Sequence, residues 1–175
     1  MAVDKEFIST IYQGWHDYQD ALTKALAPLD AEQLSLCASS NLRSVREIAA
    51  HMIGVRARWF RFGETGDAVL VFNPFTDWDR KTAKQWSAQE LVTGLEATWT
   101  GMQEAIARWT HKQWEQTWPG EDDDEPEVVT RAWVIWHLLE HDVYHGGQIS
   151  ITLRIHDAMS IEAGIIAMCP DIASI

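Results

Sequence analysis

Histidines are the residues of this chain whose type and spacing could support chemistry. His137, His141 and His145 recur at intervals of four residues, and His51 lies far from them in the sequence. Residues four apart on a helix share one face and lie about 6 Å apart, so two such imidazoles can bind one cation. A third imidazole from a facing helix would complete a site with open coordination positions. The spacing therefore predicts a divalent metal site with room for water or a substrate.

Two other interpretations of the histidines remain open from spacing alone. Buried imidazoles can be ordinary core residues whose nitrogens find hydrogen-bond partners. A metal could also be bound one turn earlier, by His137 and His141 in place of His141 and His145. The helical zinc-protease motif is absent, because Leu138 follows His137 and Asp142 follows His141 where that motif has glutamate. Spacing does not decide between these sites.

The side chains beside the histidines have separate expected roles. Gln148 lies about one turn beyond His145, where its amide could orient a ligand. We expect His137 to support the site from a second layer or to line the cleft above the metal. Glu140 and Asp142 are expected at the surface. The tryptophans closest to the histidines in sequence are expected to pack in the core: Trp59, Trp133 and Trp136.

Four stretches with apolar residues at helical spacing are expected to position the histidines. They cover residues 4–27, 44–62, 87–110 and 127–155. His51 falls on the second stretch and the histidine ladder falls on the fourth. With no strand pattern elsewhere, the sequence predicts an all-α bundle that forms a single domain over residues 1–175. Two of the starts carry capping boxes, Ser44-Val-Arg-Glu47 and Ser87-Ala-Gln-Glu90.

The connections between these stretches are long. Residues 63–86 are expected to form an ordered crossover loop that packs down through its phenylalanines and tryptophans. Residues 111–127 are expected to form an exposed loop without strands, and the acidic run 121–125 within it is expected to be solvated. The tail, 157–175, is mildly apolar and is expected to dock on the bundle or on a partner subunit.

Two adjacent glycines, Gly146 and Gly147, interrupt the fourth predicted helix. Each costs about 1 kcal/mol relative to alanine in a helix interior. We therefore expect another stretch of backbone to approach the helix closely at this point.

The net charge and the cysteine content limit which partners we expect the protein to bind and in which cellular compartment we expect it. The formal net charge of −12 repels phosphate backbones and anionic membrane surfaces, so we expect neither nucleic acid nor membrane as a partner. Cys37 and Cys169 are far apart and predict no disulfide. The first ten residues lack the pattern of a signal peptide, and no apolar run reaches the ~18 residues that span a bilayer. A cytoplasmic location is expected.

Two segments resemble the DinB/YfiT superfamily. Residues 44–51, Ser-Val-Arg-Glu-Ile-Ala-Ala-His, resemble its second helix, and residues 137–149, His-Leu-Leu-Glu-His-Asp-Val-Tyr-His-Gly-Gly-Gln-Ile, resemble its last core helix. With the order of helices and loops, the resemblance covers most of residues 4–156. It implies an antiparallel four-helix bundle in a down-up-up-down arrangement. Gly146 stands where the family often has arginine, so the role of that arginine does not carry over.

The resemblance also implies a ligand set and a range of functions. His51, His141 and His145 match the family's metal ligands, which bind zinc, nickel or a similar divalent ion such as iron or manganese. Relatives include transferases and isomerases that use mycothiol, bacillithiol or glutathione, so a metal-dependent thiol S-transferase is the first expectation. A metal-assisted hydrolase is a second, and a non-enzymatic metal-stabilised or metal-sensing module is the competing class. The family often forms dimers, which implies a homodimer here.

Overall fold

The computed structural model describes residues 5–63, 68–80, 85–119 and 128–158. Most of these residues are helical, which confirms the all-α prediction. No helix among them is long and apolar enough to span a membrane. The elements, with 3-10 helices written η, are α1 (Lys5–Leu26), η1 (Gln33–Ser35), α2 (Val45–Gly63), α3 (Ala68–Phe72), η2 (Asn73–Phe75), α4 (Ala88–Arg108), α5 (His111–Trp114), β1 (Thr117–Pro119), β2 (Val128–Thr130) and α6 (Arg131–Ile155).

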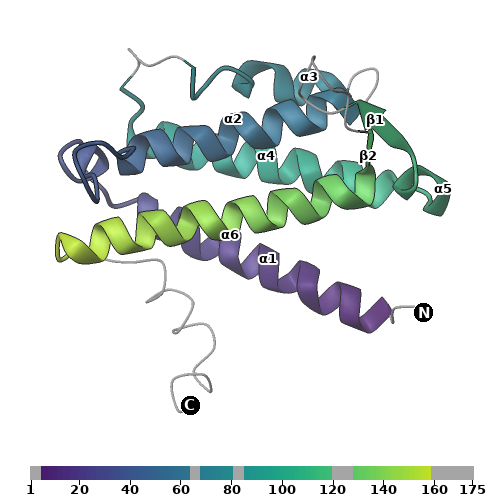
Figure 1. Cartoon of the computed structure of the whole chain (residues 1–175), viewed down its shortest axis with the longest axis horizontal. Helices are drawn as coiled ribbons and strands as arrows, with labels where there is room; N and C mark the ends of the chain where they lie inside the picture. The colour runs from purple at the N-terminus through teal and green to yellow at the C-terminus, as the bar shows by residue number, and fades with distance from the viewer. Residues whose placement is uncertain (1–4, 64–67, 81–84, 120–127, 159–175) are drawn as a thin grey trace.

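The four longest helices lie side by side and enclose the core. In Figure 1, α2 and α4 run in one direction while α1 and α6 run in the opposite one. Each contributes apolar side chains to one buried cluster that includes Leu22, Met52, Leu95 and Ile149, all without exposed surface. Helices α2 and α6 pack directly against each other, and their contact carries the histidines.

Both predicted capping boxes are present. The backbone N–H of Ser44 donates to the Glu47 carboxylate at 2.7 Å, and the Ser44 hydroxyl accepts from the Glu47 N–H at 3.3 Å. Ser87 and Glu90 form the same reciprocal pair at the start of α4. These contacts satisfy backbone donors that a helix start leaves unpaired, which fixes where α2 and α4 begin.

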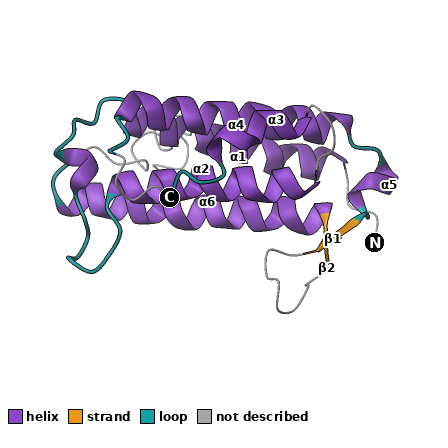
Figure 2. Cartoon of the chain, turned by 90° about the horizontal axis from the view of Figure 1, so that it is seen from above, coloured by secondary structure: helices purple, strands orange, loops and turns teal. Residues whose placement is uncertain are grey.

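The prediction of a strand-free loop over residues 111–127 is wrong. A short helix, α5, is followed by β1, which pairs antiparallel with β2 at the end of the bundle (Figure 2). The β-branched run Val128-Val129-Thr130 favours extended backbone, so α6 begins at Arg131 rather than at the expected residue 127. Thr130 caps α6 by accepting from the Trp133 N–H at 3.1 Å. The acidic run 121–125 lies outside the described residues, as does the tail from residue 159.

The crossover between α2 and α4 contains short helices that the sequence analysis did not predict. Helix α3 and the turn η2 occupy its first half, and Phe72 and Trp86 are buried, as its aromatic content indicated. The packed segment continues through Asp79 and brings that residue to α2. The crossover therefore contributes to the site as well as connecting two helices.

The two adjacent glycines of α6, Gly146 and Gly147, differ in what surrounds them. A Cβ on Gly146 would overlap the hydroxyl of Tyr18, so the close approach at this position is made by a side chain and not by the backbone that was expected. A Cβ on Gly147 would meet nothing within 4 Å. Packing among the described residues therefore explains Gly146 and gives no steric reason for Gly147.

Candidate metal centre

Three histidines meet between α2 and α6. His51 comes from α2, and His141 and His145 come from successive turns of α6. The Nε2 atoms of His51 and His141 are 3.3 Å apart, and one ligand nitrogen from each of the three rings lies within 4.8 Å of the others. The sequence analysis predicted this set of residues, and the structure brings them together.

The outer nitrogens of two rings are held by hydrogen bonds that aim the inner nitrogens at one point. His51 Nδ1 lies 2.9 Å from the Asp79 carboxylate, which can only accept, so the proton of His51 is on Nδ1. His145 Nδ1 lies 2.8 Å from the Gln148 amide oxygen, and the Gln148 amide nitrogen donates to the Tyr144 hydroxyl at 3.2 Å. Both rings therefore keep an Nε2 lone pair for a ligand. The expected orienting contact of Gln148 is present, with His145 as its partner.

Burial favours the neutral form of the two imidazoles that α6 contributes. Burial, together with the neighbouring rings of His145 and His51, lowers the pKa of His141 to about 2. Burial also lowers the pKa of His145, although its hydrogen bond to Gln148 opposes that shift. Neutral imidazole is the form that binds a metal ion.

The donor set fits a divalent ion. Tetrahedral zinc with Zn–N bonds of about 2.0–2.1 Å would separate two ligand nitrogens by about 3.3–3.4 Å, close to the distance between His51 Nε2 and His141 Nε2. His141 Nδ1 is buried and has no hydrogen-bond partner among the described residues. A proton on Nδ1 therefore makes no hydrogen bond there. A cation bound at Nε2 would account for it, because His141 then needs its Nε2 lone pair for the cation and keeps its proton on Nδ1.

Asp79 is the residue of this site that the sequence analysis missed. Burial alone would raise its pKa, but hydrogen bonds from His51 and Arg58 and the charge of Arg58 hold the pKa of this carboxyl well below its usual range. Arg58 donates to both carboxylate oxygens, at 2.8 and 3.0 Å. Gly54 makes room for the contact, because a Cβ there would lie 2.7 Å from the carboxylate. The aromatic residues of the crossover indicated that it packs down, but they did not indicate which acid it brings to α2.

His137 lies outside the group that could hold one ion. Its ring stacks on Trp133 at a centroid distance of 5.0 Å and meets the edge of Trp59 at 5.2 Å. Its Nδ1 is 3.8 Å from the Glu140 carboxylate. The geometry thus favours pairing His141 with His145 and places His137 one turn along α6. The expected core packing holds for Trp59, whereas Trp133 and Trp136 are exposed.

Asp142 corrects a further expectation. It is fully buried rather than at the surface, and it pairs with the equally buried Arg56 at 2.8 Å. The Trp15 indole N–H also donates to the carboxylate at 2.8 Å, and Arg56 donates to the Gln19 side chain at 2.7 Å. From sequence alone, a charged residue next to His141 is expected at the surface. The turn of α6 instead points the Asp142 side chain toward α1 and α2.

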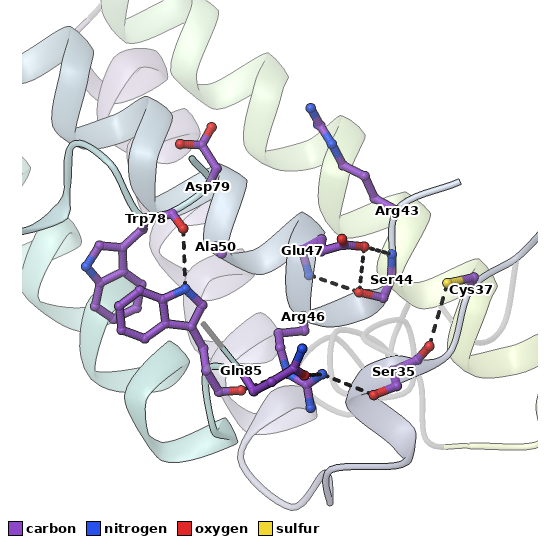
Figure 3. A pocket seen from close by; sticks show the side chains of 11 residues that line it. Ser35, Cys37, Arg43, Ser44, Arg46, Glu47, Ala50, Trp78, Asp79 and Gln85 are labelled. Atoms are coloured by element: carbon purple, nitrogen blue, oxygen red, sulfur yellow. Dashed lines mark hydrogen bonds between the residues drawn. The ribbon is translucent and has the colours of Figure 1, made fainter. Parts of the chain in front are cut away.

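Two pockets are each lined by a residue of the site. One, of about 340 Å³, is lined by Asp79, Glu47 and Arg43 among others (Figure 3). The second, of about 450 Å³, lies on the α6 side and includes His145 and Gln148 in its wall. Arg43 lines both pockets and is exposed. Of these two pockets, the second is lined by one of the three histidines, and Arg43 shares its wall.

Comparisons with known proteins decide the family. The model of the DinB family matches residues 1–156. This chain belongs to the DinB family. Its fold is similar to the crystal structure of a DinB-like protein from Bacillus cereus ATCC 10987, with a TM-score of 0.62 and 19% identity over 87% of this chain and 94% of that one. No curated protein matches.

Proposed function

We propose that this DinB-family protein is a metal-dependent thiol S-transferase that holds one divalent ion with His51, His141 and His145. The observation that carries the proposal is the convergence of three imidazoles whose outer nitrogens are hydrogen-bonded or buried. The scaffold we propose is the antiparallel four-helix bundle of the family, as a single domain. Zinc and nickel suit three imidazoles best, and iron and manganese are further candidates.

The proposed chemistry follows from an open site. A divalent ion bound there would lower the pKa of a thiol and hold the resulting thiolate. In the transfer itself, the thiol proton passes to solvent and the sulfur bonds to an electrophilic carbon. The leaving group departs with the electron pair of the broken bond. Asp79 and Gln148 contribute by fixing the orientation of His51 and His145.

The surroundings support a low-molecular-weight thiol as the substrate. The pocket beside His145 offers space, and the Arg43 guanidinium in its wall would suit a carboxylate where the thiol carries one. Mycothiol, bacillithiol and glutathione are the thiols to test, because relatives of this fold use them. A homodimer is part of the same proposal, and it does not depend on which reaction the metal supports.

The alternatives differ in what else the ion would bind. A metal-stabilised or metal-sensing module would use a closed site with a fourth protein ligand. Among the described residues, no further histidine, cysteine, aspartate or glutamate joins the three histidines. The Asp79 carboxylate is engaged by His51 and Arg58. An open site favours an enzyme, and a metal-assisted hydrolase would use the same opening for water.

The test joins metal content to turnover. Protein without a histidine tag would be loaded with zinc or nickel, and thiol consumption measured with an electrophilic substrate for each of the three thiols. We expect one ion per chain and metal-dependent consumption of at least one thiol. His141→Ala should lose both, whereas the control His137→Ala, one turn away, should keep its ion.

Each other outcome has a distinct meaning. One ion per chain with no turnover on any thiol would overturn the transferase and favour the sensing module. Metal-dependent release of product from an ester or amide, with no thiol consumed, would favour the hydrolase. An unchanged metal content in His141→Ala would overturn the site itself.

A further inference from the structure

The pocket beside His145 has an apolar rim that is open to solvent among the described residues. Leu42, from the loop before α2, and Tyr144 and Ile151, from α6, line this pocket and are each between 54% and 59% exposed. Ile155, one turn beyond Ile151 on α6, is 58% exposed. We call these four exposed residues the apolar rim. Large apolar side chains that gather at one opening indicate a surface that something else covers.

Helix α6 ends in a turn that redirects the chain. The N–H of Ala158 donates to the Leu153 carbonyl at 2.8 Å, and the N–H of Asp157 donates to the Arg154 carbonyl at 3.2 Å. Asp157 has a φ of 54°, in the left-handed region. These two bonds around a left-handed residue form a Schellman motif, which ends a helix. The chain after Asp157 therefore leaves the axis of α6.

The turn brings the chain to the edge of the same pocket. Ala158 packs against the buried core. The His156 ring donates through Nε2 to the Cys37 carbonyl oxygen at 3.1 Å, and the residue after Cys37, Ala38, lines the pocket. Residues 159–175 therefore begin beside the apolar rim.

Residues 159–175 have a sequence that suits packing on an apolar surface. Only two of them are charged, and apolar residues recur at helical spacing before Pro170: Ile161, Ile165 and Met168. An extended chain advances about 3.3 Å per residue and a helix about 1.5 Å, so this segment is long enough to run from Ala158 back to Tyr144. It also lies beyond the part of the chain that matches the DinB family model.

We propose that residues 159–175 pack on the apolar rim of their own chain and form the outer wall of the pocket beside His145. The contact takes the rim and the apolar side chains of the segment out of water together. The segment is favoured over a separate molecule because the turn after α6 and the contact of His156 with Cys37 hold its start beside the rim, which raises its effective concentration there. A molecule bound in this pocket would contact the segment as well as α6.

The first test removes an apolar side chain from each side of the contact in the full, metal-free chain. Ile151→Gln on the rim and Ile165→Gln in the segment should each lower the ratio of folded to unfolded protein about tenfold, because each uncovers the apolar surface opposite. The double variant should lose less than about thirtyfold, rather than the hundredfold of two independent losses, because either change alone already releases the segment. Urea denaturation measures the ratio.

The matched control is Leu70→Gln on α3, where the side chain is 62% exposed and lies outside the rim. It should change the ratio by less than about twofold, as the replacement of an ordinary exposed residue does. An effect of Ile151→Gln as small as that of the control would overturn the proposal, because the rim would then face only solvent. Full additivity in the double variant would also overturn it, since the two side chains would act independently.

The second test separates the same chain from a second copy as the source of the covering segment. Hydrogen exchange, read by mass spectrometry, should show residues 161–168 exchanging at least about tenfold more slowly than an unstructured peptide, and Ile151→Gln should remove this protection. The protection should be the same at two protein concentrations a hundredfold apart. Protection that falls on dilution would mean that the segment packs on another copy, and a lack of protection in the wild-type protein would mean that it does not pack. Both tests use metal-free protein, so the metal proposal stands or falls separately.

Discussion

Two polar clusters lie between the same helices, α2 and α6, and they differ in whether their own groups satisfy one another. In the first, the fully buried Arg56 guanidinium pairs with Asp142 and donates to the Gln19 side chain, and the Trp15 indole N–H donates to Asp142. In the second, the rings of His51, His141 and His145 turn their nitrogens toward each other. Opposite charges complete the first cluster, whereas three groups of the same kind leave the second incomplete.

The difference separates a structural role from a binding role. Asp142 directly follows His141 on α6, and Arg56 lies five residues after His51 on α2, so the clusters are neighbours on the same pair of helices. The closed cluster fixes how α2 and α6 sit against each other. That position in turn brings His51 to the two histidines of α6. The open cluster can then hold an ion without having to organise the helices itself.

The largest expected effect comes from opening the closed cluster. Asp142→Ala leaves the Arg56 guanidinium buried without its counter-charge and should lower the free energy of unfolding by about 3–5 kcal/mol. The measurement is urea denaturation of the metal-free protein. The control is the double variant Arg56→Met with Asp142→Leu, which removes both charges and should regain most of the loss. Equal losses in the single and double variants would show that packing, not the unpaired charge, sets the cost.

The next effect comes from the open cluster, where stability should depend on the ion. At zinc concentrations a hundredfold above the dissociation constant, the wild-type protein should gain about 2.7 kcal/mol of unfolding free energy. His141→Ala should abolish that gain and cost only about 1 kcal/mol without metal, because the cluster does not hold the helices together. Denaturation with and without zinc measures both. The control His111→Ala changes an exposed imidazole and should keep the full gain; a gain retained in His141→Ala would remove the distinction between the clusters.

A smaller effect should come from the support behind the histidines. Asp79→Asn removes the charge that holds His51 by its Nδ1 proton, and zinc affinity should fall by about 10- to 100-fold. Competition with a chromogenic chelator measures the affinity. Asp77→Asn alters an exposed acid in the same turn and should leave affinity unchanged. Equal affinities in the two variants would mean that Asp79 serves the crossover segment and not the centre.

Local features of the fold were predictable from sequence because their causes are local. The two capping boxes involve residues three apart, and both were found where expected. The helical periodicity placed the long helices to within a few residues, with the largest error at α6, where β-branched residues formed β2 instead. The four-residue spacing of His141 and His145 fixed their common face before any fold was known.

The contact of Asp79 with His51 and the buried pair of Arg56 with Asp142 could not be predicted in the same way. Asp79 reaches His51 across 28 residues, and Arg56 reaches Asp142 across 86, so no spacing rule connects them. An aspartate in a turn and an aspartate inside a helix are both most common at the surface. Their burial here depends on cationic partners that only packing supplies.

The sequence by itself determined which residues could bind an ion, and that His141 and His145 lie on one face of the same helix. The tertiary structure alone decided that His51 meets that face, that Asp79 and Gln148 orient the rings, and that His137 stays apart. The reason is physical: helix periodicity is set by the local backbone, whereas the meeting of α2 with α6 is set by the buried core and by Arg56 paired with Asp142.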